Sequence, residues 1–427
     1  MTSIVLFGTF FGLMLLRVPV AASMGLSALA CMTHLGYKIS AFPTIFYAAL
    51  AKYTLLAIPF FIIAGVVMDQ AGISRRLIGF ADACVGHRRG GLAVVTVIVM
   101  CFVAAISGSA PATVAAVGTV MIPAMTQKGY GKAFATAIVS ASGEIGMIIP
   151  PSIPYIVYAM LAEVSVGSMF MAGIVPGLLF GLFYAATALI RLKGSSVVLQ
   201  EKRGWRERLA TFKEASWSMM MPVIVLGGIY GGVFTPTESA GVAVIYGLFV
   251  GMCVYREIKP RHLWNILVKS AVTSSLIMYI MGCAGVFAWI LTTSGIAEAI
   301  TNALLTLTTN GNVMLLVITL IFLLAGMFMD SASGFYLLMP ILLPVVRSMN
   351  YSLVAFGVIA TANFAIGQVT PPVGSNLFVA CNITGLSMKE IVFQVWPFIV
   401  AGVMCLLLIT FCPWLITFVP SALGMRV

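Results

Sequence analysis

Two proline-rich stretches interrupt long apolar segments of this sequence, and both carry polar side chains. GEIGMIIPPSIPYIV, residues 143–157, contains Glu144, and GQVTPPVGSNLF, residues 367–378, contains Gln368 and Asn376. Proline lacks a backbone donor and its ring clashes with the preceding helical turn, so each Pro-Pro pair predicts a broken helix. Backbone groups freed at membrane depth are tolerated only inside protein or against a bound species. The two stretches therefore predict a binding site built from broken helices.

Two further polar interruptions, SGSAP at 107–111 and MDSASG at 329–334, divide apolar segments into hairpins whose tips would face the breaks. Hydroxyl, carbonyl and carboxylate oxygens suit a hard monovalent cation such as sodium. Helix N-termini favour the negative groups of an anion. The polar side chains of the four interruptions are Ser107, Ser109, Ser142, Glu144, Asp330, Ser331, Ser333, Asn363, Gln368, Thr370, Ser375 and Asn376.

Three acidic residues in or near spans have to be weighed separately. An unpaired charge at membrane depth costs at least about 2.5–3.5 kcal/mol, so each needs a partner or a function. Asp330 could hold a cation or cap the helix that follows it, and Glu144 could carry a proton or pair with a cationic side chain. Glu238, in TPTESAG, follows a proline and is interpreted as a first-turn residue favoured by the helix dipole.

The composition indicates an all-α polytopic membrane protein. Of the 427 residues 61% are apolar and 8% are charged, the mean hydropathy is +1.11, and apolar runs of spanning length recur. The short alternating strands of an outer-membrane barrel are absent. Eight cysteines without a CxxC pair and three histidines without ligand spacing predict no metal centre of the zinc type. The sequence lacks a phosphate-binding loop motif, so we expect no ATP hydrolysis.

The basic residues predict the orientation. The expected spans are 2–16, 19–36, 52–69, 130–165, 168–190, 217–233, 238–255, 270–292, 352–380 and 391–418, with re-entrant hairpins at 92–125 and 313–345. Of the 23 Lys and Arg residues, all but Lys38, Lys52, Arg347 and Arg426 then fall on one side, which the positive-inside rule makes cytoplasmic. Both termini are expected to be periplasmic. The net charge of +11 lies in loops between spans, so we expect no nucleic-acid partner.

Shifting the sequence by 221 residues aligns its two halves, so that Pro150–Pro151 coincides with Pro371–Pro372. Each half holds five spans, an odd number, so the second half has the opposite orientation. Inverted repeats with broken helices are typical of secondary transporters, whose sites lie near the membrane midplane. We expect a first repeat at 1–190, a cytoplasmic amphipathic linker at 191–216 and a second repeat at 217–427.

Seven motifs cover essentially the whole chain and form a specific set, although each alone is common. They are LRVPVA (16–21), IPFFIIAGVVMDQAGIS (58–74), SGSAPATVAAVGTVMIPAM (107–125), GEIGMIIPPSIPYIVY (143–158), GGVFTPTESAG (231–241), GMFMDSAS (326–333) and GQVTPPVGSNLFVA (367–380). Together they resemble the large membrane subunit, the M-type permease, of tripartite ATP-independent periplasmic (TRAP) transporters.

This resemblance implies an elevator-type, sodium-coupled importer of a carboxylated organic solute, such as a C4-dicarboxylate or sialic acid, in the bacterial inner membrane. It implies a small four-helix Q-type membrane subunit, a soluble periplasmic P-type binding protein and surrounding lipid as partners. Because the sequence begins at the first span, the small subunit is expected to be a separate chain.

The resemblance also implies sodium sites at the tips and breaks, with the solute between them. The expected sodium residues are Ser107, Gly108, Ser109, Gly143, Gly146, Pro150, Gly326, Met329, Asp330, Gly367, Gln368 and Thr370. The expected substrate residues are Ser142, Pro151, Ser152, Ser331, Asn363, Pro372, Ser375 and Asn376.

Three other interpretations are weaker. A membrane enzyme could use ISGSA (106–110) as a serine hydrolase turn, but the three histidines lie near span ends and offer no base at depth. A self-sufficient exchanger would need no binding protein, and composition does not exclude it. Prolines that merely kink helices would account for the breaks but not for two facing hairpin tips.

Overall fold

The computed structural model describes residues 1–88, 90–193, 202–308 and 310–426, and the regular elements in these ranges are all helices, as predicted. The helices of the first half are α1 (Thr2–Leu15), α2 (Val20–His34), α3 (Ala41–Leu50), α4 (Ala57–Gln70), α5 (Ile73–Val85), α6 (Gly91–Ser107), α7 (Ala110–Gln127), α8 (Lys132–Ser142), α9 (Ile145–Ile148), α10 (Ile153–Ala162) and α11 (Val166–Arg191). Those of the second half are α12 (Trp205–Tyr230), α13 (Pro236–Phe249), α14 (Pro260–Thr293), α15 (Ile296–Leu307), α16 (Gly311–Gly326), α17 (Ser331–Ser348), α18 (Leu353–Gly367), α19 (Ser375–Thr384), α20 (Met388–Phe411) and α21 (Trp414–Ala422). A 3-10 turn, Tyr53–Leu56, precedes α4, and a π-helical turn, Val250–Val254, continues α13.

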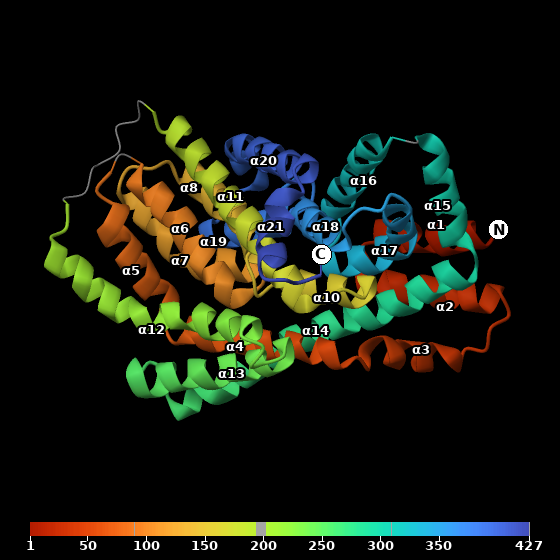
Figure 1. The fold of residues 1–427 in the computed structure, drawn as a ribbon, viewed down its shortest axis with the longest axis horizontal. Coiled ribbons are helices and arrows are strands. Elements are labelled where there is room, and N and C mark those ends of the chain that lie inside the picture. The colour runs from red at the N-terminus through yellow and green to blue at the C-terminus, as the bar shows by residue number, and fades with distance from the viewer. Residues whose placement is uncertain (89, 194–201, 309, 427) are drawn as a thin grey trace.

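The helices form two groups that lie side by side (Figure 1). In the first group α4 packs against α13 and α14, α2 packs against α1 and α14, and α12 packs against α13. In the second group the hairpin α6–α7 packs on α8 and α11, while the hairpin α16–α17 packs on α18. We call these groups the scaffold and the hairpin group. All four predicted interruptions belong to the hairpin group.

Local chemistry fixes several helix starts. Thr235 and Glu238 form a capping box at the start of α13, in which the Thr235 amide donates to Glu238 Oε2 at 2.8 Å. This geometry confirms the first-turn interpretation of Glu238. Ser387 and Glu390 form the same motif at the start of α20. Each capping box satisfies backbone donors that a helix start would otherwise leave without partners.

By length and composition, six helices in the described ranges can cross a membrane, or seven when the bent pair Lys132–Ile148 and Ile153–Ala162 counts as one span. That pair bends by 41° and corresponds to the predicted broken span 130–165. The predicted spans 2–16 and 19–36 form helices of 14 and 15 residues, and 352–380 is divided between α18, of 15 residues, and α19, of 10 residues. Each of these helices is shorter than a full crossing usually requires. Their crossing stays a prediction.

Three helices lie outside every predicted span: α3, α5 and α15. They have 10, 13 and 12 residues, too few for a span, and α5 and α15 are amphipathic. In α5 the apolar face is buried, while Arg75 and Arg76 pair with Glu257 beyond α13 at 3.1 and 2.7 Å. Such short helices give no long apolar run, which is the signal on which the span predictions depended.

The predicted boundaries around two later helices were wrong. The helix expected in the linker 191–216 and the span expected at 217–233 are one continuous helix, α12. Residues 194–201 of that linker lie outside the described residues. The helix α14 has 34 residues and begins ten residues before the predicted span 270–292. In both cases a polar, helix-forming segment continues directly into an apolar one, with no proline or glycine at the transition.

The order of helices repeats along the chain at the predicted offset. The second helix of the first hairpin, Ala110–Gln127, becomes Ser331–Ser348 when its bounds are shifted by 221 residues, which is the second helix of the second hairpin. The broken helices repeat in the same way, because α10 and α19 have starts that differ by 222 residues. Even the unpredicted α5 and α15 occupy equivalent places in the two halves.

Candidate ion and substrate site

The tip of the first hairpin contacts the first helix break directly. Gly108, between α6 and α7, has a positive φ of 63°, and its carbonyl accepts a hydrogen bond from the Ile153 amide at 3.3 Å. A Cβ at Gly108 would lie 2.8 Å from the Pro151 carbonyl oxygen. A Cβ at Gly146 would lie 2.6 Å from Thr113 Oγ1. Glycine is therefore needed on both sides of this contact.

The predicted hydroxyls at this tip bond to one another. Ser107 Oγ lies 2.5 Å from Thr113 Oγ1, which donates to the Ser109 carbonyl at 2.8 Å. Sequence reasoning missed Thr113, although it lies four residues after Ser109 and so on the same face of α7. The tip thus presents hydroxyl and carbonyl oxygens in one small cluster, a donor set that suits a monovalent cation.

The first break itself is buried from Ala141 to Ala159. Ser152 caps α10 by accepting from the Tyr155 amide at 3.4 Å, and its hydroxyl donates to the Met147 carbonyl at 2.5 Å. Ser142, in contrast, is buried and its hydroxyl lacks a hydrogen-bond partner in the described structure. Pro150 and Pro151 follow α9, as predicted, and the bond between them is cis. Gly143 packs against Val114 of the hairpin.

The tip of the second hairpin meets the second break through backbone. A Cβ on Gly367, at the end of α18, would lie 2.5 Å from the carbonyl carbon of Gly326, at the end of α16. The chain then turns through Met329, which is half-buried, to Ser331, the buried first residue of α17. The predicted pairing of tips with breaks is thus present in both halves.

Asp330 caps α17. Its Oδ2 accepts from the Ala332 and Ser333 amides at 2.9 and 3.2 Å, and its Oδ1 accepts from Ser333 Oγ at 2.6 Å. Of the two roles considered for Asp330, the structure shows the cap. Oδ2 accepts two hydrogen bonds, but Oδ1 accepts only one and keeps a lone-pair direction, so a contact of Oδ1 with a cation stays a prediction.

Most of the predicted polar residues of the second break are buried. The backbone carbonyl of Gln368 accepts a hydrogen bond from the backbone amide of Asn376 at 3.0 Å. Thr370 Oγ1 donates to the backbone carbonyl of Ile366 at 2.7 Å. Ser375 begins α19, while Pro372 lies exposed at the surface, outside this buried group.

Several buried oxygens of the two breaks have no partner in the described residues. They include Ser142 Oγ, Asn363 Oδ1, Gln368 Oε1 and Asn376 Oδ1, four neutral oxygens at predicted site residues. A buried polar group without a hydrogen bond costs about 1–3 kcal/mol, so four at predicted positions indicate that something else satisfies them. Neutral oxygens fit a sodium ion or the polar groups of a solute better than they fit a transition metal. These four predicted residues therefore have the donor chemistry that the expected sodium ions require.

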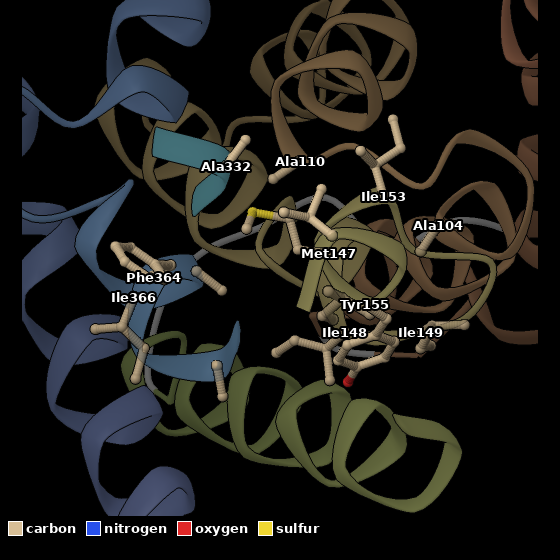
Figure 2. Packing of buried hydrophobic residues seen from close by; sticks show 14 of the residues in the cluster. Ala104, Ala110, Met147, Ile148, Ile149, Ile153, Tyr155, Ala332, Phe364 and Ile366 are labelled. Atoms are coloured by element: carbon tan, nitrogen blue, oxygen red, sulfur yellow. The ribbon is translucent and has the colours of Figure 1, made fainter. Parts of the chain in front are cut away.

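The two tip-and-break pairs join in one assembly. Tyr158 of α10 packs its ring against Phe335 of α17 with centroids 5.6 Å apart, and its hydroxyl donates to the Leu353 carbonyl at 2.6 Å. The helix α9 packs against α18, and α19 packs against α7 and α8. Figure 2 shows Ala110 and Ala332, near the starts of α7 and α17, beside Met147 of the first break.

Glu144 pairs with Tyr184, a contact that sequence reasoning missed because the two residues are 40 positions apart. Both side chains are fully buried, and the Tyr184 hydroxyl donates to Glu144 Oε2. Glu144 Oε1 has no partner, and no described salt bridge involves this carboxyl. The cationic partner that we considered is thus not found among the described residues.

We expect Tyr184→Phe to lower the stability by about 1–3 kcal/mol, because it leaves the buried Glu144 carboxyl without its donor. The measurement is thermal unfolding in lipid nanodiscs. In a Glu144→Leu background the same change is expected to cost much less, since the carboxyl is gone. Tyr47→Phe, at an exposed tyrosine, is the matched control. Equal losses in the two backgrounds would show that the Tyr184 hydroxyl stabilises something else.

These features define a multi-span helical membrane protein of the transporter class. Residues 7–415 match the family model described as "Tripartite ATP-independent periplasmic transporter, DctM component". The chain belongs to this family of transporter permeases, which are not enzymes, and the predicted resemblance is confirmed.

Relatives of known name are similar along the whole chain. The C4-dicarboxylate TRAP transporter large permease DctM of Rhodobacter capsulatus is 36% identical, with 100% of each chain covered. The isethionate TRAP transporter permease DctMQ of Oleidesulfovibrio alaskensis is 43% identical over 96% of this chain, which spans only 65% of that relative. The 2,3-diketo-L-gulonate permease YiaN of Escherichia coli is 32% identical, covering 97% of this chain and 98% of YiaN.

A solved structure shares the fold. The YdaH transporter of Alcanivorax borkumensis matches with a TM-score of 0.62 over 95% of this chain and 97% of that one, at 14% sequence identity. At this identity the likeness concerns the fold alone.

Proposed function

We propose that this chain is the permease subunit of a sodium-coupled importer for an organic anion. The observation that carries the proposal is the group of buried, unpartnered oxygens at Ser142, Asn363, Gln368 and Asn376. We propose sodium as the coupling ion because neutral hydroxyl, amide and carbonyl oxygens suit a hard monovalent cation. The tip cluster of Ser107 and Thr113 and the cap at Asp330 supply further oxygens. Sodium at these places would stabilise groups that the fold leaves without hydrogen bonds.

The cargo is proposed to be a small organic anion. The names of the relatives cover C4-dicarboxylates, isethionate and 2,3-diketo-L-gulonate. Isethionate is a sulfonate, so this class is wider than the carboxylates expected from the sequence. The helix starts at Ile153 and Ser375, which follow the two breaks, would favour the negative groups of such a solute.

Alternating access is proposed to come from movement of the hairpin group against the scaffold, the elevator mechanism. The repeat offset supports two inverted halves, 1–190 and 217–427, each with a hairpin and a broken helix. Both termini would then be periplasmic in the inner membrane. The assignment of each site residue to sodium or solute is part of this proposal.

Two protein partners are proposed, a soluble periplasmic binding protein and a small Q-type membrane subunit. The family description as a tripartite periplasmic transporter supports the first. The name DctMQ, and the length of that relative beyond the part that this chain covers, support the second. The exposed apolar side chains of α12 and α14, among them Trp217 and Tyr279, would face lipid or this subunit.

Reconstitution of the permease, small subunit and binding protein in proteoliposomes tests the proposal. We expect uptake of radiolabelled succinate, isethionate or diketogulonate to fall to background when choline replaces external sodium. Uptake that persists in choline would remove the sodium coupling. Uptake that persists without the binding protein would favour the self-sufficient exchanger.

A further inference from the structure

A cavity of about 420 Å³ lies between part of the scaffold and the first hairpin. Its scaffold wall comes from α4 and α14, and its other wall comes from α6 and α7. The deep end is formed by Ser107 and Ser109 of the hairpin tip and by Ile153 at the start of α10. The cavity therefore reaches the candidate ion and substrate site from one side.

Two exposed residues of opposite charge lie in this cavity. Asp69 at the end of α4 and Lys269 in α14 are the charged members of its described lining, and Thr273 lies one helical turn beyond Lys269. Lys269 attracts Asp69 electrostatically, yet the described salt bridges do not include Lys269. Its ammonium group can thus bind a mobile anion without breaking an ion pair.

Beside the second hairpin the scaffold helix α14 makes close contacts. There α14 packs directly against α3 and α17, and a Cβ at Gly282 would lie 2.4 Å from the Phe46 ring. A Cβ at Gly285 would lie 2.4 Å from Ala49 Cβ and 3.8 Å from the Tyr336 ring. The scaffold thus contacts the second hairpin directly through α14 and α17, whereas a cavity lies between part of the scaffold and the first hairpin.

The open side carries the basic residues. Arg75 lies in the first turn of α5, the helix that follows Asp69, on the side to which the positive-inside rule assigns nearly all lysines and arginines. In this predicted orientation, the end of the cavity at the exposed residues Asp69 and Lys269 lies toward the cytoplasm. A solute released from the hairpin tip would then pass Lys269 on its way out.

We propose that this cavity is a cytoplasmic vestibule in which Lys269 binds the carboxylate or sulfonate group of the departing anion. This inference rests on the proposed transport function and adds a residue on the scaffold to it. Asp69, on the same scaffold wall, repels the anion and competes for Lys269, so that the anion is attracted but not retained. The ammonium group is a compact point charge that accepts either acid group.

Charged thiol reagents test the vestibule without any cargo or sodium. Thr119→Cys places a thiol in the cavity wall of α7, in a background with serine at Cys253 and Cys412, the two exposed native cysteines. Labelling rates are compared in inside-out and right-side-out vesicles. The probes are an anionic sulfonate-bearing and a cationic trimethylammonium-bearing methanethiosulfonate, and the background without Thr119→Cys is the blank.

We expect the thiol of the Thr119→Cys variant to be labelled faster from the cytoplasmic side. We also expect the ratio of the labelling rate of the anionic probe to that of the cationic probe to change with the charge in the cavity. Lys269→Gln should lower that ratio by about threefold or more, Asp69→Asn should raise it, and Lys269→Arg should preserve it. Lys213→Gln on α12, outside the cavity lining, is the control for net charge and should leave the ratio unchanged.

Labelling only from the periplasmic side, or a ratio that is the same in Lys269→Gln and Lys213→Gln, would overturn the proposal. Because Asp69→Asn and Lys269→Gln are expected to act in opposite directions, a general loss of folding cannot imitate the result. Failure of sodium-dependent uptake would leave these labelling rates untouched, so the two proposals fail separately.

Discussion

Replacing Gly367 with alanine is expected to reduce sodium-dependent uptake by about 100-fold, because the second break and the second hairpin tip touch through backbone at this position. The new methyl group would lie 2.5 Å from the carbonyl carbon of Gly326 and 2.8 Å from its oxygen. Neither wall of this contact is a flexible side chain. One of the two elements must move, and overpacking of this kind costs about 1–3 kcal/mol of stability.

The matched control for Gly367→Ala is Gly227→Ala in α12, where a Cβ would meet no heavy atom within 4 Å. Alanine is favoured over glycine inside a helix, so this control is expected to be neutral or slightly stabilising. Uptake in proteoliposomes and thermal unfolding in nanodiscs are measured for both variants. Normal uptake in Gly367→Ala would show that the tip does not need to remain against the break.

Local chemistry allowed the main features of the site to be predicted. Two adjacent prolines in a helix interior remove two backbone donors and clash with the preceding turn, and the breaks after α9 and α18 were found at the expected places. The tips were found within a few residues, because SGSAP and MDSASG combine a turn with a residue that can cap a helix. The repeat strengthened both predictions, since each feature occurs twice at one offset.

What the sequence could not show depends on contacts between distant residues or on weak periodic signals. Nothing near Glu144 in the sequence points to Tyr184, and nothing near Gly326 points to Gly367, because such pairs form only when helices pack. The helices α5 and α15 are short and amphipathic, so they contain no long apolar run from which they could have been predicted. The polar start of α14 was excluded from its span for the same reason.

Asn376→Leu is expected to reduce uptake by about 100-fold while leaving the unfolding temperature unchanged or raised, a combination that a purely structural asparagine would not give. Asn376 is fully buried, and both polar atoms of its side chain lack partners in the described structure. An apolar side chain of similar volume removes the cost of about 1–3 kcal/mol that each unpaired buried group carries. It also removes the oxygen that a sodium ion or an anionic solute would contact.

The control for Asn376→Leu is Thr361→Val, a buried polar-to-apolar change on α18 whose hydroxyl already donates within its own helix to the Gly357 carbonyl at 2.8 Å. That change is expected to leave uptake within about twofold, because it removes no free oxygen.

Sodium-dependent protection of the Asn376→Leu variant against thermal unfolding, measured without solute, then shows which of the two ligands Asn376 contacts. If Asn376→Leu abolishes uptake but keeps this protection, Asn376 contacts the solute, and if it loses the protection as well, Asn376 contributes to a sodium site. An Asn376→Leu variant that is less stable yet transports normally would instead make this residue part of the packing, and the unpartnered oxygens would no longer support a binding site at the second break.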